Sequence, residues 1–266
     1  MFNWPLFLCL VVISVPGLLV SIPGLIKTLE KTVLGKLPPD KKVPPRSILT
    51  VLSCLQTLLL ITLAAAVGTI LSPRVGLGAP FFEALVSGKP LWDPLALQIL
   101  YGLAFGVGGA LIIVAAYYLV FRPRLDEQTL RGMEGLRMEL GIWARVLYGG
   151  IVEEVMFRWG VMTLLAWLGA LLFGEATPAV VWAVIVISGI LFGIGHLPSY
   201  QMAGCQKTPL FLGLMISINL WATLICGWLF WQHGLLAAMV AHMLYHLVWL
   251  PFDLYFYRRA EPELAV

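Results

Sequence analysis

Apolar runs of about 20 residues recur along the whole chain and leave few folds open to it. A helix of this length crosses the ~30 Å hydrocarbon layer of a bilayer. Seven such spans can be placed in the sequence, at approximately residues 5–26, 48–71, 95–121, 143–173, 179–197, 209–231 and 234–257. The pattern predicts an all-α polytopic membrane protein, with about seven transmembrane helices in a single domain over residues 1–266.

The composition excludes several other classes of protein. Of the 266 residues, 60% are hydrophobic and only 12% are charged, whereas soluble domains carry about 25% charged residues. A soluble globular enzyme, a disordered chain and a disulfide-stapled secreted module are therefore excluded. The formal net charge of +3 is too small to indicate nucleic-acid binding, and the apolar spans make the lipid bilayer the expected partner. The four cysteines show no CxxC spacing and are expected to be packing residues.

Positive charges are divided unequally between the two sets of loops. Thirteen Lys and Arg residues follow the first, third, fifth and last spans, whereas the opposite loops hold only Arg74 and Lys89. Because cytoplasmic loops carry the excess of Lys and Arg, we expect the N-terminus outside and the C-terminus in the cytoplasm, with the plasma membrane as the location. The spacing of apolar residues in 125–140 predicts an amphipathic helix that leads into the fourth span.

The fourth span contains three charged residues, Glu153, Glu154 and Arg158. Each charge at the centre of a membrane helix costs about 2.5–3.5 kcal/mol on an insertion scale, so such residues mark functional sites. The helix therefore needs polar partners from other spans or a water-filled cavity. The other spans offer four candidates: His196, His242, His246 and Asn219.

These polar residues are expected to meet inside the bundle. At about 1.5 Å per residue, Glu153 lies roughly 15 Å from the cytoplasmic end of its span, and His242 and His246 lie roughly 18 and 12 Å from that side. His196 lies nearer the cytoplasm. One cavity that opens to the cytoplasm could hold all four side chains.

The charged motif and the histidine of the fifth span resemble motifs of a known family. EExxxR matches Glu153, Glu154 and Arg158, and FxxxH matches Phe192 and His196. These are the first two motifs of the CAAX protease and bacteriocin-processing family of intramembrane endopeptidases, typified by the type II CAAX prenyl endopeptidases.

A third motif extends the resemblance. The family has HxxxN or a variant, and here His242 matches the histidine while His246 stands at the asparagine position. The resemblance covers about residues 143–250. It implies a helical bundle around a cytoplasm-facing cavity, and hydrolysis of a peptide bond near the C-terminus of a membrane-associated or prenylated peptide or protein.

The resemblance also implies roles for the polar residues, without a cofactor. Glu153 is expected to be the general base that activates water, with Glu154 beside it in the catalytic set. His196 would share or orient that water, and His242 and His246 would donate hydrogen bonds to the oxyanion. Three further residues are expected to support the site: Arg158, which can hold Glu154 ionised, Phe192 and Asn219.

Two alternatives remain open from the sequence. His242 and His246 are four residues apart, a spacing that suits a pair of Zn²⁺ ligands, so a zinc-dependent intramembrane peptidase is one alternative. A non-proteolytic scaffold or a proton-coupled carrier is the other, because buried Glu, Arg and His also form proton relays.

Overall fold

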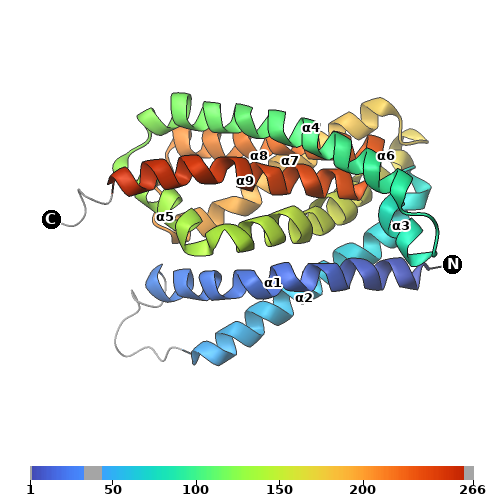
Figure 1. The fold of residues 1–266 in the computed structure, drawn as a ribbon, viewed down its shortest axis with the longest axis horizontal. Coiled ribbons are helices and arrows are strands. Elements are labelled where there is room, and N and C mark those ends of the chain that lie inside the picture. Colours follow the sequence, from blue (N-terminus) through green and yellow to red (C-terminus); the bar gives the residue numbers. More distant parts are fainter. Residues whose placement is uncertain (1, 33–43, 261–266) are drawn as a thin grey trace.

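The computed structural model describes residues 2–32 and 44–260, and these residues form a bundle of long helices with no β-strand among them (Figure 1). Seven helical stretches are long and apolar enough to cross a membrane: Trp4–Glu30, Arg46–Arg74, Trp92–Arg124, Glu127–Phe173, Pro178–Met202, Pro209–His233 and Leu235–Phe256. The predicted fold class, all-α with about seven spans, is confirmed. Much of the basic segment between the first two spans, including Lys36, Lys41 and Lys42, lies outside the described residues.

The helices follow one another in a simple order. The first three spans contain α1 (Trp4–Thr32), α2 (Arg46–Leu71) and α4 (Trp92–Ala115), with the short helix α3 (Pro80–Val86) before α4. The fourth span is composite and contains α5 (Glu127–Ala144) and α6 (Thr163–Phe173), and the last three spans are α7 (Pro178–Met202), α8 (Pro209–His233) and α9 (Leu235–Ala260). Since α1 begins and α9 ends at opposite ends of the bundle (Figure 1), the chain crosses it an odd number of times.

Local sequence sets the start of the two helices that follow the fourth span. The side chains of Thr177 and Thr208 accept hydrogen bonds from the backbone N–H groups of Val180 and Phe211. A proline follows each threonine at the first helical position, where its missing N–H has no helical partner. Threonine followed by proline therefore marks both helix starts in the sequence.

The fourth span changes direction at Gly141. The backbone there has φ 71° and ψ 164°, a conformation that glycine adopts without the strain of a side chain. Before it, α5 buries the apolar residues Met133 and Leu136, as the predicted amphipathic helix requires. After it, the chain runs into the centre of the bundle and carries the charged motif with it.

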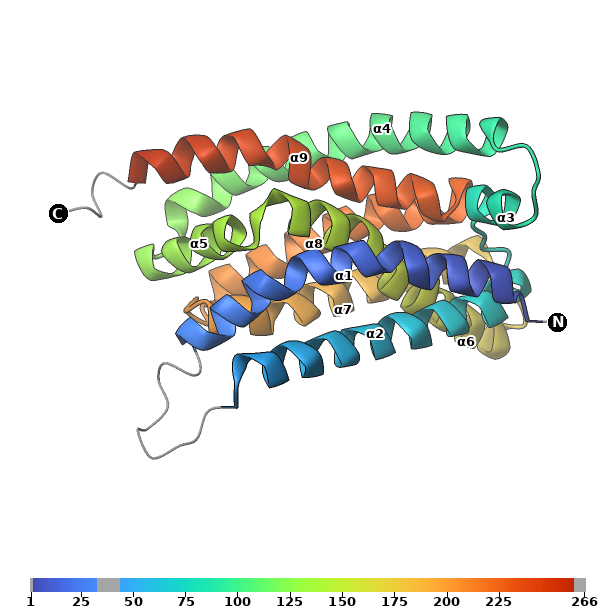
Figure 2. The ribbon, with the colours of Figure 1, turned by 60° about the horizontal axis from the view of Figure 1, so that its bottom comes forward.

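The first two helices lie side by side against the fourth span (Figure 2). Trp159 is fully buried there, and its indole Nε1 donates a hydrogen bond to the carbonyl of Ala65 on α2. A Cβ atom at Gly68 would lie 2.3 Å from the Trp159 ring, so only glycine permits this approach. Small residues at such contacts are typical of helix packing in membranes.

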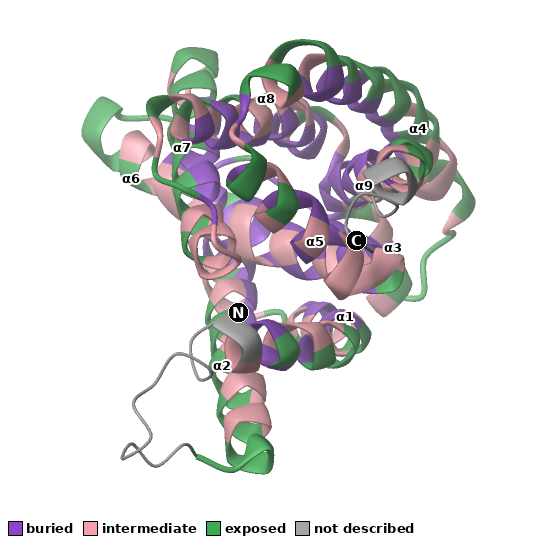
Figure 3. Cartoon of the chain, turned by 90° about the vertical axis from the view of Figure 1, so that its left-hand side faces the viewer, coloured by how far each residue is buried: buried purple, intermediate pink, exposed green. Residues whose placement is uncertain are grey.

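Apolar side chains cover much of the outside of the bundle, whereas several charged side chains, Glu154 and Arg158 among them, are buried inside it. Figure 3 shows exposed residues on the outer faces of α2, α4 and α6. They include large apolar residues such as Leu55, Leu59, Leu100 and Leu171. This distribution fits a multi-pass protein that faces lipid, and the buried charges are the functional candidates.

Candidate active site

The helix that carries the charged motif is wider than an α-helix at this point. Arg145–Glu153 and Val155–Met162 both adopt π-helical hydrogen bonding. Such segments are rare and occur frequently at functional sites, because they redirect side chains relative to an α-helix. The two acidic residues therefore lie in the most irregular part of the longest span.

Two glycines bring this segment close to α9. A Cβ atom at Gly149 would lie 2.5 Å from His246 Nε2, and one at Gly150 would lie 2.3 Å from Met243 Cγ. The backbone of the fourth span thus approaches α9 beside the two histidines. Our sequence reasoning missed Gly149; the signal was the Gly-Gly pair one turn before the adjacent glutamates.

Glu154 forms a closed ionic cluster. Its Oε1 is 2.7 Å from His242 Nδ1, and its Oε2 is 3.1 Å from Arg158 Nε. The side chains of Glu154 and Arg158 are both 0% exposed. The predicted i,i+4 pair is therefore present, but neither residue lines the cavity.

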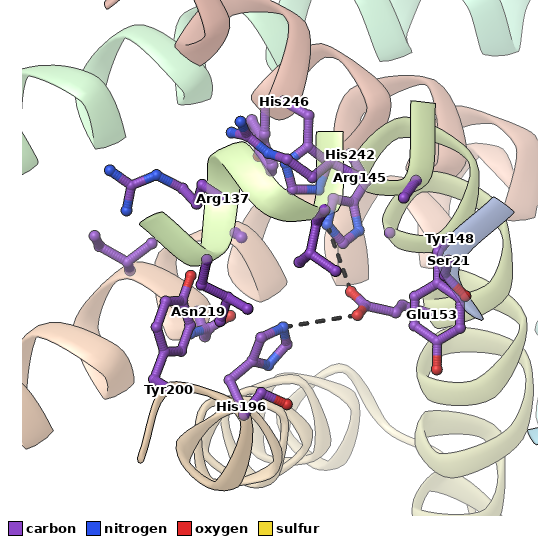
Figure 4. A pocket seen from close by; sticks show the side chains of 18 of the residues that line it. Ser21, Arg137, Arg145, Tyr148, Glu153, His196, Tyr200, Asn219, His242 and His246 are labelled. Atoms are coloured by element: carbon purple, nitrogen blue, oxygen red, sulfur yellow. Dashed lines mark ion pairs between the residues drawn. The ribbon is translucent and has the colours of Figure 1, made fainter. Parts of the chain in front are cut away.

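Glu153 points into the cavity between two histidines (Figure 4). Its Oε1 is 3.7 Å from His196 Nε2, and its Oε2 is 3.8 Å from His242 Nε2. Its side chain is 15% exposed, in contrast to the completely buried Glu154. Both distances are longer than a direct hydrogen bond and are of the kind that a bridging water fills.

A hydrogen bond to the backbone fixes the orientation of the His196 ring. Its Nδ1 lies 2.8 Å from the carbonyl oxygen of Phe192, which can only accept, so Nδ1 donates this hydrogen bond. The Phe192 ring packs edge-on against His196 and also lies under the guanidinium of Arg158, 5.1 Å from its centre. Phe192 therefore connects the histidine of α7 with the closed cluster.

His246 and Asn219 complete the polar lining. The imidazole of His246 stacks on that of His242, with 5.2 Å between the ring centres. Asn219 on α8 donates a hydrogen bond from Nδ2 to the carbonyl of Met215, which holds the amide at the cavity wall. Six of the eight predicted site residues thus line one cavity of about 290 Å³: Glu153, Phe192, His196, Asn219, His242 and His246.

The cavity wall also contains charges that our sequence reasoning did not assign to the site. Arg137 and Arg145 line it, and both bind Asp253 on α9. Asp253 lies inside the last predicted span, so a carboxylate among apolar residues was the available signal. The remainder of the wall is largely apolar, with Ile22 and Leu25 of α1 among its residues.

Within the described residues, no cysteine lines the cavity. In residues 2–32 and 44–260, no group of three or more His, Cys, Asp or Glu side chains is arranged to hold a metal ion. All four cysteines are free. Cys205 lies in the loop between α7 and α8, where burial raises the pKa of its thiol to about 12.

A comparison with known families finds a match for the segment that carries the three motifs. Residues 137–248 match the family model described as type II CAAX prenyl endopeptidase Rce1-like. This segment is therefore similar to Rce1-like domains. It contains all three motifs, from Glu153 to His246, and the predicted resemblance is confirmed. No curated protein and no solved structure matches the chain.

The Rce1-like match concerns the general activity only. It supports intramembrane endopeptidase activity of the CAAX type and indicates a hydrolase. Proteases of this family act on prenylated peptides in the membrane, and the seven apolar helices fit that setting.

Proposed function

We propose that this chain hydrolyses a peptide bond near the C-terminus of a membrane-associated or prenylated peptide or protein, with Glu153 as the general base. One observation carries the proposal: the Glu153 carboxylate faces the cavity with an imidazole Nε2 on each side, at 3.7 and 3.8 Å. A water molecule held among these groups would be polarised by a base and oriented by a neighbour, which is what hydrolysis requires.

The role of His196 follows from its hydrogen bond to the backbone. Since Nδ1 carries the hydrogen that goes to Phe192, Nε2 of the neutral ring is an acceptor. A water that donates one hydrogen to Glu153 and the other to His196 Nε2 has a lone pair directed away from both groups. That lone pair attacks the carbonyl carbon of the substrate.

The role of His242 follows from the closed cluster. The Glu154 carboxylate accepts a hydrogen bond from His242 Nδ1, 2.7 Å away. A second hydrogen, on Nε2, therefore makes the His242 ring an imidazolium, with the Glu154 carboxylate as its counter-charge. In this form Nε2 donates to the oxyanion that develops on the substrate carbonyl. Glu154 is then a positioning residue for His242, and Arg158 fixes Glu154 in turn.

The reaction can be written with all protons assigned. The oxygen of the water bonds to the carbonyl carbon while Glu153 takes one proton from the water. The tetrahedral oxyanion receives hydrogen bonds from His242 and from a ring N–H of His246. When the C–N bond breaks, Glu153 returns its proton to the leaving amine. This cycle regenerates the carboxylate, and no cofactor is needed.

A cleavage assay tests the proposal. The purified protein in lipid nanodiscs should cleave a fluorogenic prenylated peptide at one bond near its C-terminus, as mapped by mass spectrometry. Glu127→Gln is a matched control, because Glu127 lies on the exposed face of α5. If the wild-type protein cleaves no peptide, a scaffold or carrier role replaces the proposal, and if Glu153→Gln cleaves as fast as the wild type, Glu153 is not the base.

The same assay distinguishes the zinc alternative, which rests on His242 and His246. A glutamate-based mechanism keeps its rate after treatment with a chelator and dialysis. Loss of activity on chelation, recovered with one equivalent of Zn²⁺, would establish the zinc mechanism instead.

A further inference from the structure

The wall of the cavity contains a second ionic cluster, formed by Arg137, Arg145 and Asp253. Arg137 donates to both carboxylate oxygens of Asp253, at 2.9 to 3.2 Å, and Arg145 Nη1 lies 2.9 Å from Asp253 Oδ2. The three side chains are 2 to 7% exposed. Both arginines nevertheless line the cavity, and Figure 4 shows them in one view with Glu153.

The charges of this cluster do not balance. Two guanidinium groups share one carboxylate, which leaves one positive charge in excess. The nearby Glu134 does not compensate it, because Glu134 is paired with Arg122 at 2.8 Å. Neither Arg137 nor Arg145 forms another ion pair within the described residues. A buried charge without a partner is costly, so the excess favours an anion that enters the cavity.

Arg145 is the arginine of this cluster that has unused N–H donors. A guanidinium has five N–H groups, and within the described part of the chain Arg145 uses one of them, to Asp253. Arg137 is more fully engaged, since its Nη2 also donates to the hydroxyl of Tyr117 and its guanidinium lies over the Tyr117 and Trp249 rings. A carboxylate in the cavity would therefore meet Arg145, and a guanidinium binds a carboxylate through two parallel hydrogen bonds.

The position of Arg145 along the helix sets a distance to the proposed base. Arg145 and Glu153 are eight residues apart on one helical segment, which is about 12 Å along an α-helix and less where the turns are wider. An extended peptide covers about 3.3 Å per residue, so three to four residues span this distance. The anion at Arg145 would thus be a few residues from the bond that Glu153 attacks.

From these observations we infer that Arg145, supported by Arg137 and Asp253, binds the free C-terminal carboxylate of the substrate. The inference rests on the proposed endopeptidase function and adds to it a specificity site. It places the bond that is cut a short distance from the C-terminus: the carboxylate anchors one end of an extended segment, and the scissile carbonyl reaches Glu153 at the other.

The test compares two substrates and two proteins. One prenylated fluorogenic peptide is made as the free acid and as the C-terminal carboxamide, and each is given to the wild-type chain and to Arg145→Gln in nanodiscs. We expect kcat/KM of the wild type to be about 10–100-fold higher for the acid, the range of a charged hydrogen-bonded pair. Arg145→Gln should lose this preference, so that its kcat/KM values for the acid and the carboxamide differ by less than about twofold.

Two control variants separate the effect of the Arg145 side chain on substrate preference from effects on folding. Arg131→Gln removes an exposed arginine of α5 that pairs with Glu127, and it should keep the full preference for the acid. Arg145→Lys keeps the charge but not the two parallel donors, so its preference should be intermediate. Equal cleavage of acid and carboxamide by the wild type, or an undiminished preference in Arg145→Gln, overturns the inference while the proposed function stands.

A binding measurement tests the inference separately from turnover. The wild type and Glu153→Gln should both bind the acid peptide about 10–100-fold more tightly than the carboxamide. This result supports the carboxylate site even if no peptide is cleaved, in which case the proposed function alone fails. Equal binding of the two peptides overturns the inference whether or not the wild type is active.

Discussion

Two buried ionic clusters lie along the fourth span, and they differ in whether their arginines reach the cavity. In the first, Glu154 is enclosed between Arg158 and His242, and the Glu154 and Arg158 side chains are 0% exposed. In the second, Arg137 and Arg145 share Asp253 and reach the cavity with one positive charge in excess. An arginine that is closed off from the cavity, such as Arg158, can only hold other groups in place, whereas arginines that line the cavity can bind a ligand.

The largest effect should come from breaking the closed cluster. Arg158→Met leaves the Glu154 carboxylate without its guanidinium in the centre of the bundle, which should cost about 3–5 kcal/mol of stability. The melting temperature of the purified protein measures this loss. Arg145→Gln is the comparison: Arg137 still pairs with Asp253 on both oxygens, so its melting temperature should stay near that of the wild type. Equal losses in the two variants would remove the distinction between the clusters.

Substitution of His246 is expected to have a large effect on the rate of peptide cleavage and no effect on stability. Since His246 is proposed only to present an N–H donor, His246→Asn should keep kcat/KM within about tenfold, whereas His246→Ala should lose about 10²–10³. Steady-state kinetics of the three proteins check this order. If both variants are inactive and the wild type contains stoichiometric zinc, the histidine is a metal ligand.

A smaller effect is expected where the fourth span touches α9. A Cβ at Gly149 would lie 2.5 Å from His246 Nε2, so Gly149→Ala must displace the imidazole. A shift of about 1 Å in a catalytic group costs up to about 10²-fold in rate, and we expect a loss of about 10–10²-fold in kcat/KM. Gly135→Ala in α5 is the control, because nothing lies within 4 Å of its Cβ. Equal rates for the two variants would show that His246 does not depend on this contact.

The side of the membrane to which the cavity opens depends on the topology of the chain, and the charge distribution predicts that topology. In a cysteine-free background, single cysteines at Lys89 and Glu175 should react with an impermeant reagent added outside the cell, and one at Glu127 should not. All three residues are exposed in the structure. The reversed pattern would place the cavity on the opposite side of the membrane from the one predicted.

The apolar pattern was sufficient to predict the seven helices, because length and hydropathy alone determine which segments cross a membrane. It could not predict the π-helical turns of Arg145–Glu153, since nearly every position there is apolar or glycine and no helical period stands out. Gly141, where the chain turns inward, lies between the amphipathic helix predicted at 125–140 and the span predicted at 143–173, so the sequence indicated the boundary but not its backbone conformation.

The site was predictable where the motif residues are close in sequence or have distinctive types. Glu153, His196 and His242 could be placed at one cavity from the motifs and the depth of each span. The second cluster could not be assembled in this way, because Arg145 and Asp253 lie on spans more than a hundred residues apart. Which charges meet across a bundle depends on how the helices rotate about their axes, and an apolar sequence does not determine that rotation.

The central claim is that adjacent glutamates have different roles, and one pair of identical substitutions tests it directly. Glu153→Gln and Glu154→Gln are compared for peptide cleavage and for melting temperature in the same nanodiscs. We predict that Glu153→Gln lowers turnover by at least about 10²–10⁴-fold with an unchanged melting temperature, because an amide cannot accept the proton of water. Glu154→Gln should lower the melting temperature, because Arg158 loses its buried partner. Wild-type turnover in Glu153→Gln would contradict the account.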